Sequence, residues 1–416
     1  PGPVLLSLPA WTPGAYEISD FAKFVTEFAA TGQGPTGDGR ALDWDKVDYD
    51  TWRIDPAGAR AVEVRFTYRG SDFDNAKTWL QPDFAFFNGT NVFLYPEGRP
   101  LDFASTVVVR TAPAWKVATG MPRAADGSTY AAASYHDLVD YPVFVGRMDW
   151  DSVRVEDGWS RVASYPAGAL SGGARADFHS QVAKMIPVQA RVFGGEVPWG
   201  RDYTTLLVFS EEYQGGSALE HANSHVGLYA TFLIGNPLLP SITAHEIFHA
   251  WNVKRLRPAD LVPYRYDAPQ PTTLLWVSEG ITDYYADLTL VRAGIVPEQL
   301  FYALTAGKMD EVRAVPPIAL EDASLSTWIG PVDGTATIYY PKGSLAGFML
   351  DVMIREASDN QRGLDDVMRE LYRTAFGAGG RGFTDDQFWA AASRAAGGRS
   401  FAELRERYID GRDPYP

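Results

Sequence analysis

The stretch SITAHEIFHAWNVKRL, residues 241–256, contains two of the six histidines in a chain of 416 residues. His245 and His249 are four positions apart, so on a helix they lie on one face and can offer two imidazole nitrogens to one metal ion. Glu246 follows His245 directly and can reach a water molecule at that ion. A random sequence of this composition would contain the pattern roughly 0.004 times, so chance explains it poorly. The stretch therefore predicts a helix that carries a metal site, with Ser241 after Pro240 as its N-terminal cap.

A second segment, LLWVSEGITDYYADLTL at residues 274–290, supplies the candidate third ligand. Its pattern predicts a helix of roughly 20 residues that ends near Gly294. Glu279 stands in the apolar beginning of this segment, where burying an unpaired carboxylate is costly and a metal ion would remove the cost. The alternative is a carboxylate that only stabilises the start of a helix. A catalytic zinc site needs three protein ligands and an open position, which His245, His249 and Glu279 would provide.

The composition restricts the class of protein. A hydrophobic fraction of 46% with 12 Trp, 21 Tyr and 22 Phe is typical of an ordered globular protein with a sizeable core. The net charge of -15 argues against nucleic acid and against anionic membranes as partners. The absence of cysteine excludes disulfides, thiolate catalysis and cysteine-ligated zinc. No apolar run approaches the ~18 residues that a membrane span requires.

The pattern of the chain predicts an α+β protein with several domains. Segments such as AVEVRFTYRG and STVVVRTA, separated by the turn signals NGT, PEG and ADGS, predict β-strands up to about residue 172. A helix from Phe178 to Phe193 and a strand, YTTLLVFSEEY, are expected next. From Ser241 onward, amphipathic segments with acidic or Ser/Thr starts predict mostly helices.

Several motifs resemble the glycyl aminopeptidase family, which comprises PDZ-bearing gluzincin zinc metallopeptidases distantly similar to aminopeptidase N. HEIFHAWNVKRLRP followed by LLWVSEGITDYY carries the resemblance, and it extends to other stretches over nearly the whole chain: LPAWTPGAYEISDFAKFV, FFNGTNVFLY, LVDYPVFVG, LEHANS, YYPKGSLAGFMLDVMIRE and RYIDGRDPYP. It implies a β-rich N-terminal domain at 1–172, a thermolysin-like catalytic domain at 173–300 and a helical C-terminal domain at 301–416. Family members also have an extra upstream strand and a PDZ domain, which is expected after residue 416. The first residues include neither a methionine nor a signal peptide, which is expected of a processed or trimmed chain.

The resemblance also implies roles for individual residues. His245, His249 and Glu279 would bind one zinc ion per chain, and Glu246 would be the general base. Tyr340, in the pattern Y-x-K-G, is similar to the oxyanion tyrosine of aminopeptidase N relatives, with the neighbouring Tyr339 as the alternative.

Glu220 stands where relatives have the glutamate that binds the substrate amine. Ser217 and Ala218 replace two glycines that the family usually has before it, which leaves the backbone geometry there open. The alternative for Glu220 is a solvated carboxylate at the end of a strand.

The predicted function is a zinc aminopeptidase acting on peptides with a free N-terminus, and the resemblance suggests a preference for glycine or alanine at that end. One alternative is an endopeptidase on the same zinc core, which would not need Glu220 to face the metal. Another is a non-catalytic peptide-binding scaffold, which the presence of Glu246 and all three ligands disfavours. The Arg-rich, Lys-poor balance is typical of a GC-rich bacterial genome, and we expect a soluble protein whose location, periplasmic or secreted, stays open.

Overall fold

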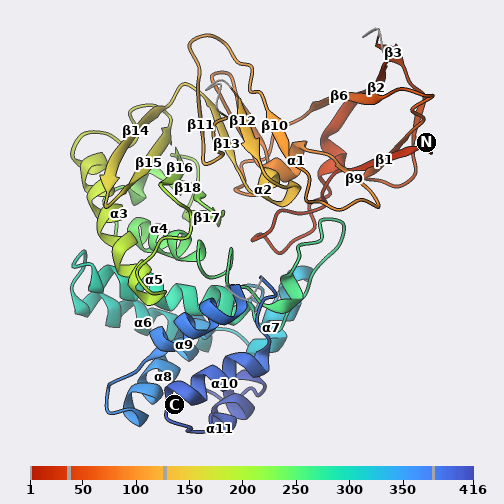
Figure 1. Cartoon of the computed structure of the whole chain (residues 1–416). Coiled ribbons are helices and arrows are strands. Elements are labelled where there is room, and N and C mark those ends of the chain that lie inside the picture. Colours follow the sequence, from red (N-terminus) through yellow and green to blue (C-terminus); the bar gives the residue numbers. More distant parts are fainter. Residues whose placement is uncertain (1, 35–38, 125–128, 377–379) are drawn as a thin grey trace. The chain divides into compact units, whose positions relative to one another are not determined.

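The computed structural model of the chain describes residues 2–34, 39–124, 129–376 and 380–416. It divides into two compact units, Pro1–Met148 with Arg265–Pro269, and Asp149–Tyr264 with Gln270–Pro416 (Figure 1). The first is rich in strands, whereas the second combines one sheet with many helices, which confirms the α+β class. The predicted boundaries at residues 172 and 300 stay predictions.

The first unit consists mainly of antiparallel β-sheets. Its strands are β1 (Val4–Ser7), β2 (Val25–Gln33), β3 (Arg40–Ala41), β4 (Trp44–Lys46), β5 (Thr51–Ile54), β6 (Ala61–Tyr68), β7 (Trp79–Gln81), β8 (Phe84–Phe87), β9 (Tyr95–Pro96), β10 (Ser105–Val107), β11 (Lys116–Thr119), β12 (Tyr130–Ala132) and β13 (Val143–Gly146). Its short helices are η1 (Phe21–Phe24), α1 (Gly89–Val92) and α2 (Tyr135–Val139). The sheet orders are β4-β5-β1-β9, β3-β2-β6, β11-β13-β8-β7 and β10-β12.

The three turns predicted for the first unit agree with the structure only in part. Residues 97–98 of PEG form a turn after β9, as predicted. The interpretation of NGT as a turn between strands is wrong, because Gly89 begins the helix α1. Glycine is required there, since a Cβ on Gly89 would lie 2.6 Å from the Cα of Val139. The ADGS signal, at residues 125–128, lies outside the described residues.

The second unit contains a five-stranded mixed sheet that places one candidate site residue at its edge. The strands are β14 (Asp149–Val155), β15 (Gly158–Tyr165), β16 (Asp202–Ser210), β17 (Gly216–Glu220) and β18 (Ser224–Ala230). Their order is β14-β15-β16-β18-β17, in which β15, β16 and β18 run parallel and the edge strands β14 and β17 run antiparallel. The central strands β16 and β18 are buried almost throughout, as strands covered on both faces must be.

Helices make up the rest of the second unit. They are α3 (Gly172–Val192), η2 (Thr231–Leu233), α4 (Leu238–His249), η3 (Ala259–Leu261), the π-helix η4 (Trp276–Gly280), α5 (Ile281–Arg292), α6 (Glu298–Arg313), α7 (Leu320–Ser326), η5 (Thr327–Ile329), α8 (Tyr339–Ala357), α9 (Leu364–Leu371), η6 (Tyr372–Phe376), α10 (Asp385–Ala395), α11 (Ala402–Leu404) and η7 (Arg405–Ile409). The amphipathic segments predicted after Ser241 are all helical. The helix predicted from Phe178 begins six residues earlier, at Gly172, and α4 lies between α3, α5 and the sheet edge.

The prediction that Ser241 caps the metal-bearing helix is wrong. The helix α4 begins at Leu238, after Pro237, whose φ of -59° is already helical. Ser241 therefore lies inside the helix, where its hydroxyl donates a 2.8 Å hydrogen bond to the carboxylate of Asp287 on α5. A buried carboxylate needs such donors, and this tertiary contact outweighs the capping preference of serine.

A buried charge network joins the helices of this unit. Lys308 on α6 lies 2.6 Å from the Asp283 carboxylate and 2.7 Å from that of Asp287, both on α5. Its ammonium also donates a 2.9 Å hydrogen bond to the Ser344 hydroxyl on α8. Because Asp287 accepts from Ser241 as well, the network fixes α4, α5, α6 and α8 relative to one another.

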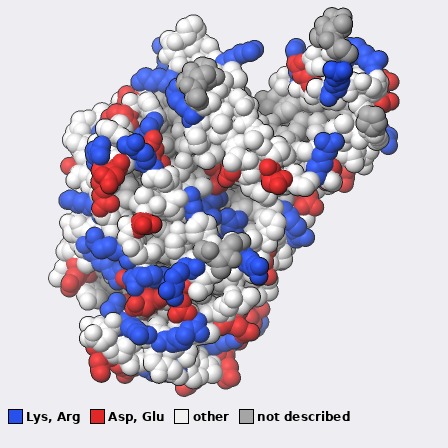
Figure 2. All heavy atoms as spheres, viewed as in Figure 1, with Lys and Arg blue, Asp and Glu red and all other residues white. Residues whose placement is uncertain are grey.

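Two surface properties complete the description. On the face shown in Figure 2, Lys and Arg side chains lie among Asp and Glu side chains, so the charge is not segregated there. Within the described residues, no helix combines the length and the hydropathy that a membrane span requires.

Candidate active site

The helix α4 presents its two histidines to one point. His245 and His249 are both buried, and their Nε2 atoms lie 2.9 Å apart. The Nδ1 atom of His249 lies 2.6 Å from the backbone carbonyl of Asn252. A carbonyl can only accept a hydrogen bond, so Nδ1 carries the hydrogen and Nε2 faces the other histidine.

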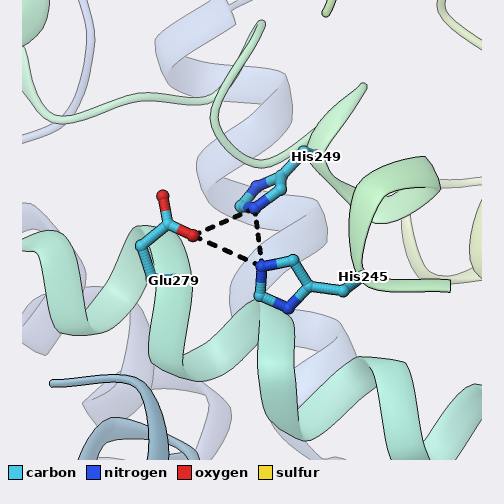
Figure 3. A group of neighbouring side chains, drawn as sticks. All are labelled: His245, His249 and Glu279. Carbon is cyan, nitrogen blue, oxygen red and sulfur yellow. Dashed lines mark hydrogen bonds and ion pairs between the residues drawn. The ribbon is translucent and has the colours of Figure 1, made fainter. Parts of the chain in front are cut away.

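Glu279 completes a triangle of ligand atoms with the histidines. Its carboxylate oxygen Oε2 lies 3.3 Å from Nε2 of His245 and 3.0 Å from Nε2 of His249 (Figure 3). The residue is 2% exposed, near the end of the π-helix η4. A π-helical turn changes the direction of side chains on a helix and often marks a functional site. Here the turn precedes α5 and directs Glu279 toward α4 (Figure 3).

The triangle fits a zinc ion. The set of two imidazoles and one carboxylate is that of catalytic zinc sites, and tetrahedral bonds of about 2.0–2.2 Å would place the ligand atoms roughly 3.3–3.6 Å apart. The observed separations of 2.9, 3.0 and 3.3 Å lie at or slightly below that range. The electrostatics also favour a cation at this point. Although burial opposes the charged form of His249, Glu279 raises the pKa of His249 to about 10. Burial and the neighbouring His249 lower the pKa of His245, so these groups accommodate one positive charge between them.

Asn252 holds the two halves of the triangle together. Its side-chain amide lies 3.0 Å from the carbonyl of Val277, 3.3 Å from that of Ser278 and 3.0 Å from the hydroxyl of Thr282. The same residue accepts the hydrogen bond of His249 through its backbone. Asn252 thus connects a metal-facing histidine to the turn that carries Glu279. The sequence analysis missed this residue. The one signal that could have found it is an amide side chain three residues after His249.

Glu246 lies beside the triangle as a buried carboxylate. It is 5% exposed, and its Oε2 atom has no hydrogen-bond partner among the described residues. Burial raises the pKa of Glu246 well above its usual value, whereas the nearby His249 opposes this shift. Buried polar atoms are rarely left without partners, so an unpartnered carboxylate oxygen indicates a place for a water or a substrate group.

Glu220 is a second carboxylate of this kind. It ends the edge strand β17 opposite His225 of β18, and it is only 3% exposed. Its Oε1 atom has no partner among the described residues. Burial raises the pKa of Glu220 to about 7, while His249 and Lys254 counteract that rise. The alternative of a solvated carboxylate at a strand end is therefore excluded, and the residue lies within electrostatic reach of the triangle.

Tyr340 approaches the triangle from α8. Its ring centroid lies 5.9 Å from that of His245, and the two rings are inclined by 33°. Burial raises the pKa of the Tyr340 hydroxyl well above its usual value, and Glu279, Glu220 and Glu246 add to this rise. The hydroxyl of the alternative, Tyr339, lies 3.3 Å from that of Thr327. Of the two tyrosines, Tyr340 is thus the one whose ring lies near that of a predicted ligand, His245.

Two glycines permit this approach. A Cβ atom on Gly280 would lie 2.5 Å from the Cα of Gly343 and 2.6 Å from the carbonyl oxygen of Tyr339. No side chain fits there, so the π-helix η4 and the first turn of α8 are in backbone contact. This contact places Tyr340 beside the turn that carries Glu279. All six predicted site residues lie in the second unit.

Two domain profiles of one family match separate parts of the chain. The Peptidase M61 N-terminal domain matches residues 1–147, and the M61 glycyl aminopeptidase domain matches residues 239–346, which include the triangle and Tyr340. A comparison with curated proteins gave no match.

Solved structures share the fold. An aminopeptidase N family protein from Idiomarina loihiensis superimposes with a TM-score of 0.89 at 25% identity, over 100% of this chain and 73% of that chain. The M1 zinc metallopeptidase from Deinococcus radiodurans gives a TM-score of 0.58 at 16% identity, over 100% of this chain and 88% of that one. Yeast LTA4 hydrolase in complex with bestatin gives 0.57 at 16%, over 97% and 60% respectively.

Proposed function

Because the chain belongs to the M61 glycyl aminopeptidase family and is a metallopeptidase, we propose that it removes the N-terminal residue of peptides in a zinc-dependent reaction. His245, His249 and Glu279 would bind one zinc ion per chain, as their converging ligand atoms support. The ion would supply Lewis-acid chemistry, by polarising the scissile carbonyl and lowering the pKa of water.

Glu246 is the proposed general base. Its free carboxylate oxygen takes a proton from the water that attacks the first peptide carbonyl, and then delivers that proton to the leaving amine. The residue is suited to this task because it follows a ligand in sequence, is shielded from bulk solvent and has an oxygen without a partner.

Tyr340 is the proposed hydrogen-bond donor to the oxyanion that forms during this attack. Donors aimed at developing charge are effective because they need no reorganisation during the reaction. The packing of Gly280 against Gly343 supports such a fixed position, since it ties the first turn of α8 to the turn of Glu279.

The buried carboxylate of Glu220 is the observation that carries the assignment to an aminopeptidase. A substrate ammonium has a pKa near ~8 and is mostly charged at neutral pH. Taking it out of water without an anionic partner is costly. Glu220 offers a free oxygen within electrostatic reach of the triangle, so it can bind the amine and exclude substrates that extend further in the N-terminal direction.

The first prediction tests this role. Wild-type enzyme is expected to cleave glycyl anilide and to reject N-acetylglycyl anilide, which lacks the ammonium and adds bulk beside Glu220. Replacing Glu220 with alanine should lower kcat/KM for glycyl anilide by about 10- to 100-fold, the scale of a lost charge-assisted hydrogen bond. Both kcat and KM should change, because the ammonium also positions the carbonyl.

The matched control is Glu212→Ala, which removes an exposed carboxylate of the same unit and should leave the kinetics unchanged. Equal cleavage of both anilides by the wild type would refute the amine-binding role and favour an endopeptidase. The same assay over aminoacyl anilides tests the proposed preference for glycine and alanine, which rests on the family alone.

The second prediction concerns the oxyanion donor. Tyr340→Phe should lower kcat by roughly 10²-fold with little change in zinc content, because only a hydroxyl is removed. Tyr339→Phe is the control, and it should retain most of the activity. If kcat survives in the Tyr340 variant and falls in the Tyr339 variant, the assignment of the two tyrosines is reversed.

A further inference from the structure

A cavity that does not include the residues of the metal triangle lies in the helical part of the second unit. It has a volume of about 330 Å³, between α6, α8 and residues 412–415. Apolar side chains form most of its wall, among them Met309, Val312, Val315 and Leu345. Ligand sites in proteins are commonly apolar cavities of this size with a few polar groups that fix orientation.

Lys342 supplies such a polar group. It is 5% exposed, and its ammonium donates a hydrogen bond to the backbone carbonyl of Ile318. The ammonium also lies 5.4 Å from the centroid of the Tyr415 ring, within range of a cation–π contact. No carboxylate of the described residues forms an ion pair with it, and no charged neighbour affects its pKa. Burial lowers the pKa of Lys342 to about 8, which reflects the cost of a charge without an anionic partner.

The charged residues around the cavity do not supply the missing anion. Asp413 is the acidic residue of the wall, and its carboxylate lies 2.9 Å from Arg407. The two other cations of the wall, Arg313 and Arg412, pair with carboxylates outside it. Lys342 is therefore the cation of the wall that has no carboxylate partner among the described residues.

We propose that this cavity binds a small monocarboxylate with an apolar body, whose carboxylate pairs with the ammonium of Lys342 and whose apolar part fills the space between α6 and α8. The proposal does not depend on the peptidase reaction. Lys342 is two residues beyond Tyr340 on α8, and residues two apart on a helix point to different sides, so the two side chains serve different sites.

The test is calorimetric binding of 4-methylpentanoate and of its uncharged amide to the zinc-loaded protein. Wild-type protein should bind the carboxylate about tenfold more tightly than the amide, as expected for a hydrogen-bonded charge pair. Lys342→Met keeps a stem of similar length and should abolish this preference. Lys184→Met, at an exposed position on α3, should retain it.

A second variant tests whether the ligand binds in the cavity and not at the metal, and whether the effect of Lys342→Met is due to misfolding. Val312→Trp fills the cavity from the half-buried face of α6 and should weaken the carboxylate and the amide alike, with Lys342 intact. Two further ligands distinguish the natural sources of such a carboxylate, which are a peptide C-terminus and a free amino acid. N-Acetylleucine mimics the C-terminus, whereas leucine carries an additional ammonium. Equal affinity for carboxylate and amide in the wild type, or unaltered affinity in both variants, would overturn the proposal.

Discussion

Replacing His249 with alanine is expected to abolish zinc binding and peptidase activity together. The substitution removes one of three ligand atoms and also the hydrogen bond that ties α4 to the Asn252 carbonyl. A zinc site with three protein ligands tolerates little loss, because the remaining imidazole and carboxylate bind the ion much more weakly. We therefore expect the largest effect of any single substitution here, with turnover of glycyl anilide falling to background.

The measurement is zinc per chain by elemental analysis, together with thermal unfolding in the presence and absence of a chelator. Binding to the folded state stabilises a protein, so chelation should lower the Tm of the wild type but leave that of His249→Ala unchanged. His179→Ala is the matched control, because His179 lies on α3 and pairs with Asp151, outside the triangle. A His249 variant that retained one zinc per chain and normal turnover would show that the triangle is not the metal site.

The convergence of His245, His249 and Glu279 could be predicted from sequence because its requirements are local. A spacing of four residues places two histidines on one helical face, whatever the rest of the chain does. The cost of burying a carboxylate in an apolar segment then singles out Glu279. These arguments need only helical periodicity and the chemistry of the side chains.

The supporting structure could not be predicted because it depends on contacts between distant segments. Ser241 is followed by a helical pattern and matches an N-cap, yet its hydroxyl serves a carboxylate on another helix, 46 residues away. Asn252 lies just after the histidine helix, and its role appears only once the turn of Glu279 packs against it. No periodicity in the sequence indicates either contact.

The position of Tyr340 illustrates the same limit. The Y-x-K-G pattern suggested the residue through a resemblance, but nothing local explains why α8 approaches the triangle. The reason is the backbone contact of Gly280 with Gly343, two residues that are 63 positions apart in the sequence. A glycine inside a helical segment destabilises the helix itself. The close backbone contact between Gly280 and Gly343 is the reason that both positions have glycine.

Replacing Glu246 with glutamine separates the chemical step from metal binding. Its effect on kcat should be at least as large as that of Tyr340→Phe, the other substitution expected to leave the zinc in place. The amide has the size and shape of the carboxylate, so the fold and the zinc content should be retained. It cannot accept a proton from the attacking water, because an amide nitrogen and oxygen are both poor bases. General bases contribute typically ~10²–10⁴-fold, and kcat should fall by about that factor.

The comparison that decides the role of Glu246 uses three variants under one assay. Glu246→Asp keeps a carboxylate but withdraws it by one methylene, so its kcat should lie between that of the wild type and that of Glu246→Gln. Glu211→Gln, at an exposed position after β16, should behave as the wild type. All three proteins should contain one zinc per chain and show the same loss of Tm on chelation. If Glu246→Gln contained zinc and kept a kcat close to that of the wild type, proton transfer would have to be assigned to another group, and the buried, unpartnered oxygen of Glu220 would be the next to test.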